Sequence, residues 1–259
     1  MHITKSSFSC MRGNLTIRGT EYRPEGENLP IAIVCHGFMA FQSTVKKYAK
    51  VIASCGYLTY TFDFCGGSFL FGKSDGKTEE MSVLTEVEDL ECVVDYALSR
   101  EYSRKTDLFL MGCSQGGFVT AILAGKQKYD ITKLGLFYPA FSIPDDARNG
   151  KMLMAKFNPE NIPDIIWCGP MKLGRRYVAD VINMNVYREI ESYNHDIFMV
   201  HGTEDTIVDN TYTIRAYEAY LDRNPKRALN MKMVHGGGHG FTGKKDKSVR
   251  ERLKRFAES

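Results

Sequence analysis

Short apolar runs recur along the chain and are separated by longer amphipathic stretches. The runs predict strands, because a strand buried on both faces reads as a continuous apolar run. They lie at 31–35, 57–62, 108–111, 133–137, 196–200 and 229–234, after an opening hairpin strand at 14–23. Helical patterns fill the gaps at 44–55, 82–99, 117–128, 211–222 and 247–257. This alternation predicts an α/β fold with a mostly parallel central sheet flanked by helices.

One stretch, 142–190, interrupts the alternation between the predicted strands at 133–137 and 196–200. It holds four prolines and Trp167, the only tryptophan of the chain. A connection of this length is too long for a simple loop, so we expect an inserted cap over the carboxyl edge of the sheet that contributes to a ligand pocket. The alternative is a helical pair that only packs its aromatic side chains on the sheet. With this insertion included, we expect one domain spanning 1–259.

The segment Gly112-Cys113-Ser114-Gln115-Gly116 matches the Gly-x-Ser-x-Gly pattern. It follows the predicted strand at 108–111 and leads into a predicted helix. Small residues around a serine let the chain turn sharply and leave the hydroxyl at the carboxyl end of the strand. We therefore interpret Ser114 as a nucleophile. The competing interpretation is a glycine-rich turn with an idle serine.

A nucleophilic serine needs a base and an acid that orients the base. In chain order the base should come last, and His239 follows the final predicted strand within a run of glycines. His235, nearer that strand, is the rival. The acid should follow the preceding strand, where we favour Asp205 over its neighbours Glu204 and Asp209, either of which would also suit a helix cap.

The developing oxyanion needs two hydrogen-bond donors. The apolar run 31–35 leads directly into His36-Gly37-Phe38, and the loop there offers the backbone NH of Phe38. The backbone NH of Gln115 is the second expected donor. We expect His36 to be a structural hydrogen-bonding residue beneath the loop and not a second base.

Composition narrows the possible partners and compartment. The net charge of +3 comes from 34 basic and 31 acidic residues. The dense basic patch falls in the last predicted helix, where a solvent-exposed helix explains it better than a nucleic-acid-binding surface does. Seven cysteines without paired metal-like spacing suit a reducing cytosol. The first residues lack a secretory leader, and no apolar run reaches the length that crosses a bilayer. We expect a cytoplasmic protein without nucleic-acid or membrane partners.

With these residues in place, the chain resembles the α/β-hydrolase superfamily and, within it, the bacterial cinnamoyl or feruloyl esterases. The likeness covers nearly the whole length. The elbow and the acid segment are shared across the superfamily, whereas the insertion segment Asn158-Pro159-Glu160-Asn161-Ile162-Pro163-Asp164 is narrower and indicates the subfamily.

The resemblance implies a cap that holds a phenolic acyl group, with Asp146 and Tyr177 near the ring hydroxyl and Trp167 at a cap position. It also implies a homodimer. Three departures affect this interpretation: Leu153 replaces a polar residue near the ring, 65–72 is longer and more apolar than the family's glycine loop, and Cys113 replaces a histidine before the serine. We expect the last change to alter packing more than chemistry.

These residues favour a serine carboxylesterase that acts on a small-molecule ester, with hydroxycinnamate or other aryl and short-acyl esters as substrates. Such chemistry requires no metal or organic cofactor. Two alternatives stay open: a thioesterase or amidase with the same triad, because the triad is silent on the leaving group, and a non-catalytic binding protein on the same fold.

Overall fold

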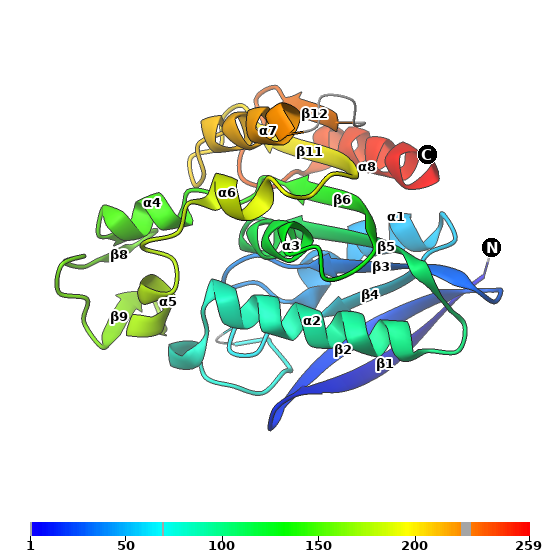
Figure 1. Cartoon of the computed structure of the whole chain (residues 1–259), viewed down its shortest axis with the longest axis horizontal. Helices are drawn as coiled ribbons and strands as arrows, with labels where there is room; N and C mark the ends of the chain where they lie inside the picture. The colour runs from blue at the N-terminus through cyan, green and yellow to red at the C-terminus, as the bar shows by residue number, and fades with distance from the viewer. Residues whose placement is uncertain (1, 69, 224–228) are drawn as a thin grey trace.

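The computed structural model describes residues 2–68, 70–223 and 229–259, and it shows an α/β fold built on an eight-stranded sheet (Figure 1). The strands lie in the order β1-β2-β4-β3-β5-β6-β11-β12, and β2 alone among them runs against the others. Their bounds are β1 Ile3–Arg12, β2 Leu15–Pro24, β3 Leu29–Cys35, β4 Leu58–Phe62, β5 Ser103–Cys113, β6 Ile131–Phe137, β11 Asp196–Gly202 and β12 Leu229–Val234. The predicted fold class, a mostly parallel sheet flanked by helices, is confirmed.

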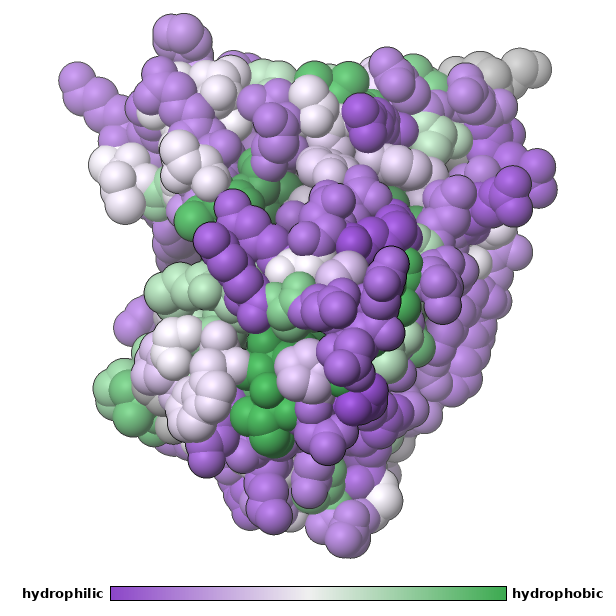
Figure 2. Space-filling model, turned by 90° about the vertical axis from the view of Figure 1, so that its left-hand side faces the viewer, coloured by the Kyte–Doolittle hydropathy of each residue, from purple (hydrophilic) through white to green (hydrophobic). Residues whose placement is uncertain are grey.

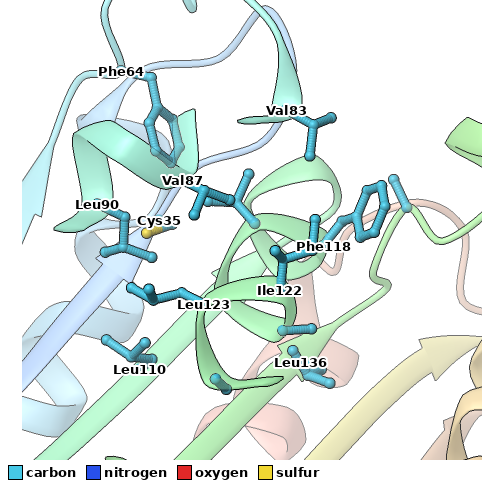
Figure 3. Packing of buried hydrophobic residues seen from close by; sticks show 14 of the residues in the cluster. Cys35, Phe64, Val83, Val87, Leu90, Leu110, Phe118, Ile122, Leu123 and Leu136 are labelled. Atoms are coloured by element: carbon cyan, nitrogen blue, oxygen red, sulfur yellow. The ribbon is translucent and has the colours of Figure 1, made fainter. Parts of the chain in front are cut away.

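Helices cover both faces of the sheet. On one face α1 (Lys46–Ala53) and α8 (Gly243–Glu258) enclose one apolar core. On the other, α2 (Val83–Ser99), α3 (Gln115–Gly125) and α7 (Thr211–Arg223) enclose a larger one. In Figure 3, the side chains of α2 and α3 point toward one another above sheet residues such as Leu110 and Leu136. Each face therefore buries a continuous apolar layer.

Local sequence signals set the helix boundaries. The chain enters α2 through a capping box, in which the Ser82 hydroxyl accepts a hydrogen bond from the Thr85 backbone NH at 3.2 Å and the Thr85 hydroxyl accepts one from the Ser82 NH at 2.8 Å. The predicted helix at 44–55 begins two residues later, at Lys46, as α1, after a 3-10 turn, η1 (Gln42–Thr44). A second turn, η2 (Thr78–Glu80), precedes α2.

The first strand is the main difference from the sequence-based prediction, which placed a single opening strand at 14–23. β1 pairs with β2 along its full length, from Ile3 opposite Pro24 to Arg12 opposite Leu15. Its sequence is mostly polar, and Phe8 alone among its ten residues is buried. An edge strand with so little buried surface lacks the alternation that predicts a strand.

The insertion between β6 and β11 is built from short elements and not from a helical pair. Two antiparallel two-stranded sheets follow one short helix and precede two others. They are α4 Ile143–Arg148, β7 Lys151–Met152, β8 Ala155–Lys156, β9 Ile165–Cys168, β10 Met171–Gly174, α5 Arg175–Ala179 and α6 Val186–Ile190. Leu153 and Gly169 have positive φ angles and lie in the tight turns of the two hairpins. These hairpins occupy the middle of the insertion, where the alternative interpretation placed a helical pair. In Figure 1 the insertion stands at one end of the sheet.

No helix within the described residues combines the length and the apolar run that a membrane crossing requires. Residue 69, within the apolar stretch 65–72 that the sequence singled out, lies outside the described residues.

Candidate active site

Ser114 occupies a sharp turn between β5 and α3. Its backbone lies at φ +55° and ψ −123°, a conformation that costs a non-glycine residue free energy and persists because the surroundings impose it. The glycines on either side make the turn possible: a Cβ at Gly112 would lie 2.1 Å from the carbonyl oxygen of Gly116, and one at Gly116 would lie 2.2 Å from that of His36. The strand and helix therefore pack closely and leave the serine side chain at the edge of the sheet.

Three distant residues meet at this turn. The Ser114 Oγ lies 2.9 Å from His239 Nε2, and His239 Nδ1 lies 2.8 Å from Asp205 Oδ2. His239 comes from the loop after β12 and Asp205 from the loop after β11, so both reach the serine from carboxyl ends of strands. The structure thus brings together the serine, acid and histidine that the sequence singled out.

The rival residues lie elsewhere. Asp209 accepts hydrogen bonds from the backbone NH and the hydroxyl of Thr211, which fits its expected role as a cap of α7. His235 and Glu204 are both exposed. The carboxylate that contacts His239 is therefore that of Asp205.

The Asp205 carboxylate is buried and fully engaged. Its Oδ1 accepts hydrogen bonds from the backbone NH groups of Ile207 and Val208, and its Oδ2 also lies 3.0 Å from Nε2 of His201. Burial alone would raise the pKa of this carboxyl, but the hydrogen bonds from His201, His239 and Val208 outweigh burial and hold its pKa well below the ordinary value. The acid is therefore an anion beside the imidazole of His239.

His201 was missed by the sequence-based analysis. It is fully buried at the end of β11, and its Nδ1 lies 2.7 Å from the Thr213 hydroxyl of α7. Its place four residues before Asp205, inside an apolar strand, was the available signal, because a buried histidine requires polar partners.

His36 holds the loop that follows β3 through hydrogen bonds, the structural role that the sequence predicted. It is fully buried, its Nδ1 lies 2.8 Å from the Gly37 carbonyl, and its Nε2 accepts a hydrogen bond from the Phe64 backbone NH at 3.2 Å. Burial lowers the pKa of this histidine, which favours the neutral ring that both contacts require. The contacts bind the loop after β3 to the chain that follows β4.

The backbone amides of Gln115 and Phe38 belong to residues next to the turn at Ser114 and to the loop that packs on it. Gln115 is the first residue of α3, where NH groups lack intrahelical partners, and Phe38 follows Gly37, whose Cα packs against Ser114. Within the described ranges, neither amide donates a hydrogen bond to another protein group. Both are therefore available to an oxygen atom bound next to Ser114.

The Gln115 side chain connects the turn to its surroundings. Its Nε2 donates to Glu86 Oε2 of α2 at 2.8 Å, and its Oε1 accepts a hydrogen bond from the Tyr177 hydroxyl of α5. Glu86 is fully buried, and burial raises the pKa of its carboxyl well above the ordinary value. Neither Glu86 nor its contact with Gln115 was predicted. A glutamate in the first turn of a predicted helix is typical of a solvent-exposed position.

A cavity of about 250 Å³ opens beside Ser114 and His239. Its wall is mainly apolar and comes from the loop after β3, the segment from the end of β6 through the insertion, and the loop after β11: Phe38, Met39, Ala140, Ser142, Ile143, Asp146, Met152, Leu153, Cys168, Leu173, Tyr177, Ile207 and Val208. Figure 2 shows this end of the molecule, where hydrophobic surface is visible in a recess among hydrophilic residues. A wall of this kind suits an apolar group held by a few polar contacts.

Two of the three expected binding residues reach this cavity. Asp146 lines it and accepts a hydrogen bond from the Ser142 hydroxyl at 2.8 Å, while burial raises the pKa of its carboxyl. Tyr177 lines it with a buried ring that lies 5.5 Å from that of Phe38. Leu153, the expected departure from the family, is also part of the wall.

Trp167 is not part of the cavity wall. It is 59% exposed, and Lys172 Nζ lies 5.0 Å from its ring centroid. In β9 alternate side chains point to opposite faces, so Ile166 and Cys168 are buried and Trp167 faces outward. Its neighbour Cys168 lines the cavity instead.

Other features around the serine bear on its chemistry. Cys113 is buried, and burial raises the pKa of its thiol to about 12, so the thiol is uncharged at neutral pH. In the described part of the chain, no group of three or more His, Cys, Asp or Glu side chains is arranged to hold a metal ion.

Comparisons with known proteins support the fold. The structure of Est1E from Butyrivibrio proteoclasticus with ferulic acid bound is similar with a TM-score of 0.86 and 27% sequence identity, over 96% of this chain and 97% of that one. A second Est1E structure gives a TM-score of 0.82 and 25% identity, over 96% of both chains. An esterase from Pyrococcus furiosus, at 17% identity and a TM-score of 0.72 over 98% of this chain and 90% of that one, shares the fold.

At the sequence level, two curated relatives from Escherichia coli, each described as an uncharacterized 31.7 kDa protein in the traX-finO intergenic region, are 32% identical over 96 residues. The match covers 36% of this chain and about a third of each relative's length. The model of the family described as "Serine aminopeptidase, S33" matches residues 26–180, which is more than half of the chain. The chain therefore belongs to this S33 family of α/β-hydrolases.

Proposed function

We propose that this protein is a serine carboxylesterase whose triad is Ser114, His239 and Asp205. The observation that carries the proposal is the continuous line of hydrogen bonds from Ser114 Oγ through His239 to the Asp205 carboxylate. A serine in such contact is activated because the imidazole accepts its proton during attack.

In the proposed reaction, Ser114 Oγ attacks the ester carbonyl while His239 Nε2 accepts its proton. The amides of Phe38 and Gln115 donate hydrogen bonds to the oxyanion, and each such donor contributes roughly a hundredfold or more in rate. His239 then donates the proton to the leaving alcohol. A water molecule, deprotonated by His239, releases the acid from the acyl-enzyme. Asp205 stays ionised and stabilises the imidazolium formed in both steps.

We further propose that the acyl group is a hydroxycinnamate or a similar aryl or short acyl group. The cavity is apolar and small, with polar groups at Asp146 and Tyr177. The ferulic acid in the Est1E structure supports an aryl acyl group, since the two chains align over nearly their whole lengths. The apolar Leu153 in the wall favours a ring with few polar substituents.

Two measurements test the chemistry. Ser114→Ala should remove nearly all hydrolysis of aryl esters and keep the far-UV circular dichroism spectrum, because it deletes a single hydroxyl oxygen. A fluorophosphonate probe should label Ser114 in the native protein and not in the variant. Retained turnover in Ser114→Ala, or no labelling of folded protein, would leave a non-catalytic binding protein.

A substrate panel tests the acyl and leaving groups. Methyl ferulate, caffeate and p-coumarate should be hydrolysed faster than acetyl and butyryl aryl esters. The same acyl group should be offered as ester, thioester and anilide, because the family description names an aminopeptidase. Preference for the anilide or thioester would reassign the leaving group and keep the triad.

A further inference from the structure

A second groove, lined by other residues than the cavity beside Ser114, lies elsewhere in the described part of the chain. It has a volume of about 580 Å³ and lies on the face of the sheet that α1 covers, over β1, β2 and β4. Alternate residues of β1 (Lys5, Ser7 and Ser9) and of β2 (Arg18, Thr20 and Tyr22) form its floor. Ser43, Lys46, Phe71 and Lys73 belong to its walls.

Cationic side chains dominate the groove. Lys5, Lys46 and Lys73 are exposed, and in the described ranges none of the three forms an ion pair. Arg18 adds a fourth cation and is paired with Asp75 at 2.6 Å. Like charges gathered without counter-charges attract an anion.

The one carboxylate of the groove wall does not oppose this attraction strongly. Asp63 is 1% exposed and accepts three hydrogen bonds, from the backbone NH and the side-chain amide of Gln42 at 2.7 and 3.0 Å and from the Lys73 backbone NH at 3.0 Å. Its charge is thus directed inward, toward groups that hold η1 and the loop after β4 together. The three ammonium groups and the hydroxyls of Ser7, Ser9 and Ser43 remain for a ligand.

Two aromatic rings stand at one end of the groove. Phe41 and Phe71 lie with ring centroids 5.3 Å apart, and Phe71 is 64% exposed. An exposed ring next to cations suits a ligand that combines a planar ring with negative charge. The volume is in the range of sites that hold small ligands of nucleotide size.

We propose that this groove binds a phosphorylated small molecule with a planar ring, of the nucleoside diphosphate class. The phosphates contact the ammonium groups of Lys5, Lys46 and Lys73, and the ring contacts Phe71. The groove shares only a connecting segment with the active site: Phe38 and Met39 line the cavity, and Phe41 and Gln42 line the groove. Binding in the groove is therefore independent of Ser114.

Isothermal titration calorimetry of the full chain at about 0.15 M salt tests the proposal with ADP, pyrophosphate and adenosine as probes. We expect saturable ADP binding with a Kd below about 1 mM, weaker binding of pyrophosphate and none of adenosine. Lys46→Ala/Lys73→Ala should weaken ADP binding about tenfold, since each exposed charge contact contributes modestly. Phe71→Ala should weaken binding of ADP and not of pyrophosphate.

Lys244→Ala/Lys247→Ala removes two exposed cations from the start of α8 and is the matched control, which should bind ADP as the wild type does. Ser114→Ala should also bind ADP normally, so a failed esterase assignment leaves this result intact. The proposal is overturned by absent ADP binding, by an equal loss in the α8 control, or by pyrophosphate binding as tightly as ADP.

Discussion

The turn at Ser114 and the insertion meet at one cavity, yet their residues are held in different ways. Ser114, His239 and Asp205 lie at carboxyl ends of strands in a sheet with buried layers on both faces. The insertion consists of strands of two to four residues and helices of five or six, and it carries exposed apolar side chains such as Met154 and Trp167.

We expect this difference to separate the residues that carry out the reaction from those that select the substrate. The triad depends on distances of about a hydrogen bond, which a rigid sheet maintains, and every oxygen of Asp205 is engaged. The insertion contributes mainly apolar wall to the cavity, and short elements tolerate substitution better than buried strands. We therefore expect substitutions in the triad to abolish turnover of every ester, and substitutions in the insertion to redistribute turnover among esters.

The largest effect is expected at the base. His239→Ala should lower kcat roughly 10⁴- to 10⁶-fold on all esters, because no other group accepts the serine proton. His235→Ala is the matched control, four residues earlier and exposed, and should keep kcat within about twofold. Steady-state kinetics on one aryl ester measure both. A large loss in His235→Ala with activity in His239→Ala would reverse the assignment.

A slightly smaller loss is expected at the acid. Asp205→Asn should lower kcat about 10⁴-fold, since the amide no longer stabilises the imidazolium. The substitution also probes stability. The folded pKa of Asp205 is depressed, so its ionisation stabilises the fold above the unfolded pKa of about 3.9, and this contribution is lost as pH falls from there toward the folded pKa.

The free energy of unfolding should therefore differ most between wild type and Asp205→Asn near neutral pH, and the difference should shrink below about pH 4. Urea unfolding at pH 6, 5, 4 and 3, followed by circular dichroism, measures it. A difference that stays constant down to pH 3 would show that the Asp205 carboxylate is not stabilised in the folded protein.

The contrast between buried strands and short or exposed elements also explains which parts of the fold and site were predictable from the sequence. The central strands were predictable because a strand buried on both faces has a continuous run of apolar residues. The serine, the acid and the histidine each follow such a run directly. β1 was not predictable, since an edge strand with only Phe8 buried carries no such run. The prediction of the Phe38 and Gln115 amides as oxyanion donors rests on position alone, because backbone groups need no particular side chain.

Side-chain contacts between residues far apart in the chain could not be predicted from the sequence. The contact from Glu86 through Gln115 to Tyr177 joins three elements, and His201 contacts Asp205 only because the loop after β11 folds back. In the insertion, the facing of Trp167 depends on the register of β9 against β10, which a one-residue shift would reverse. Resemblance suggested the residue type, whereas only the pairing decides the face.

The smallest effects are expected in the insertion, where two variants sharpen the comparison. Asp146→Asn should change the ratio of kcat/KM for methyl ferulate over a butyryl aryl ester by about tenfold, since one polar contact to a ring hydroxyl is worth roughly 1.4 kcal/mol. Trp167→Ala should change this ratio less than about twofold, because the exposed indole lies outside the cavity wall. If Trp167→Ala alters the ratio more than Asp146→Asn does, then the acyl group extends out of the cavity across β9, and selection is made on the outer face of the insertion.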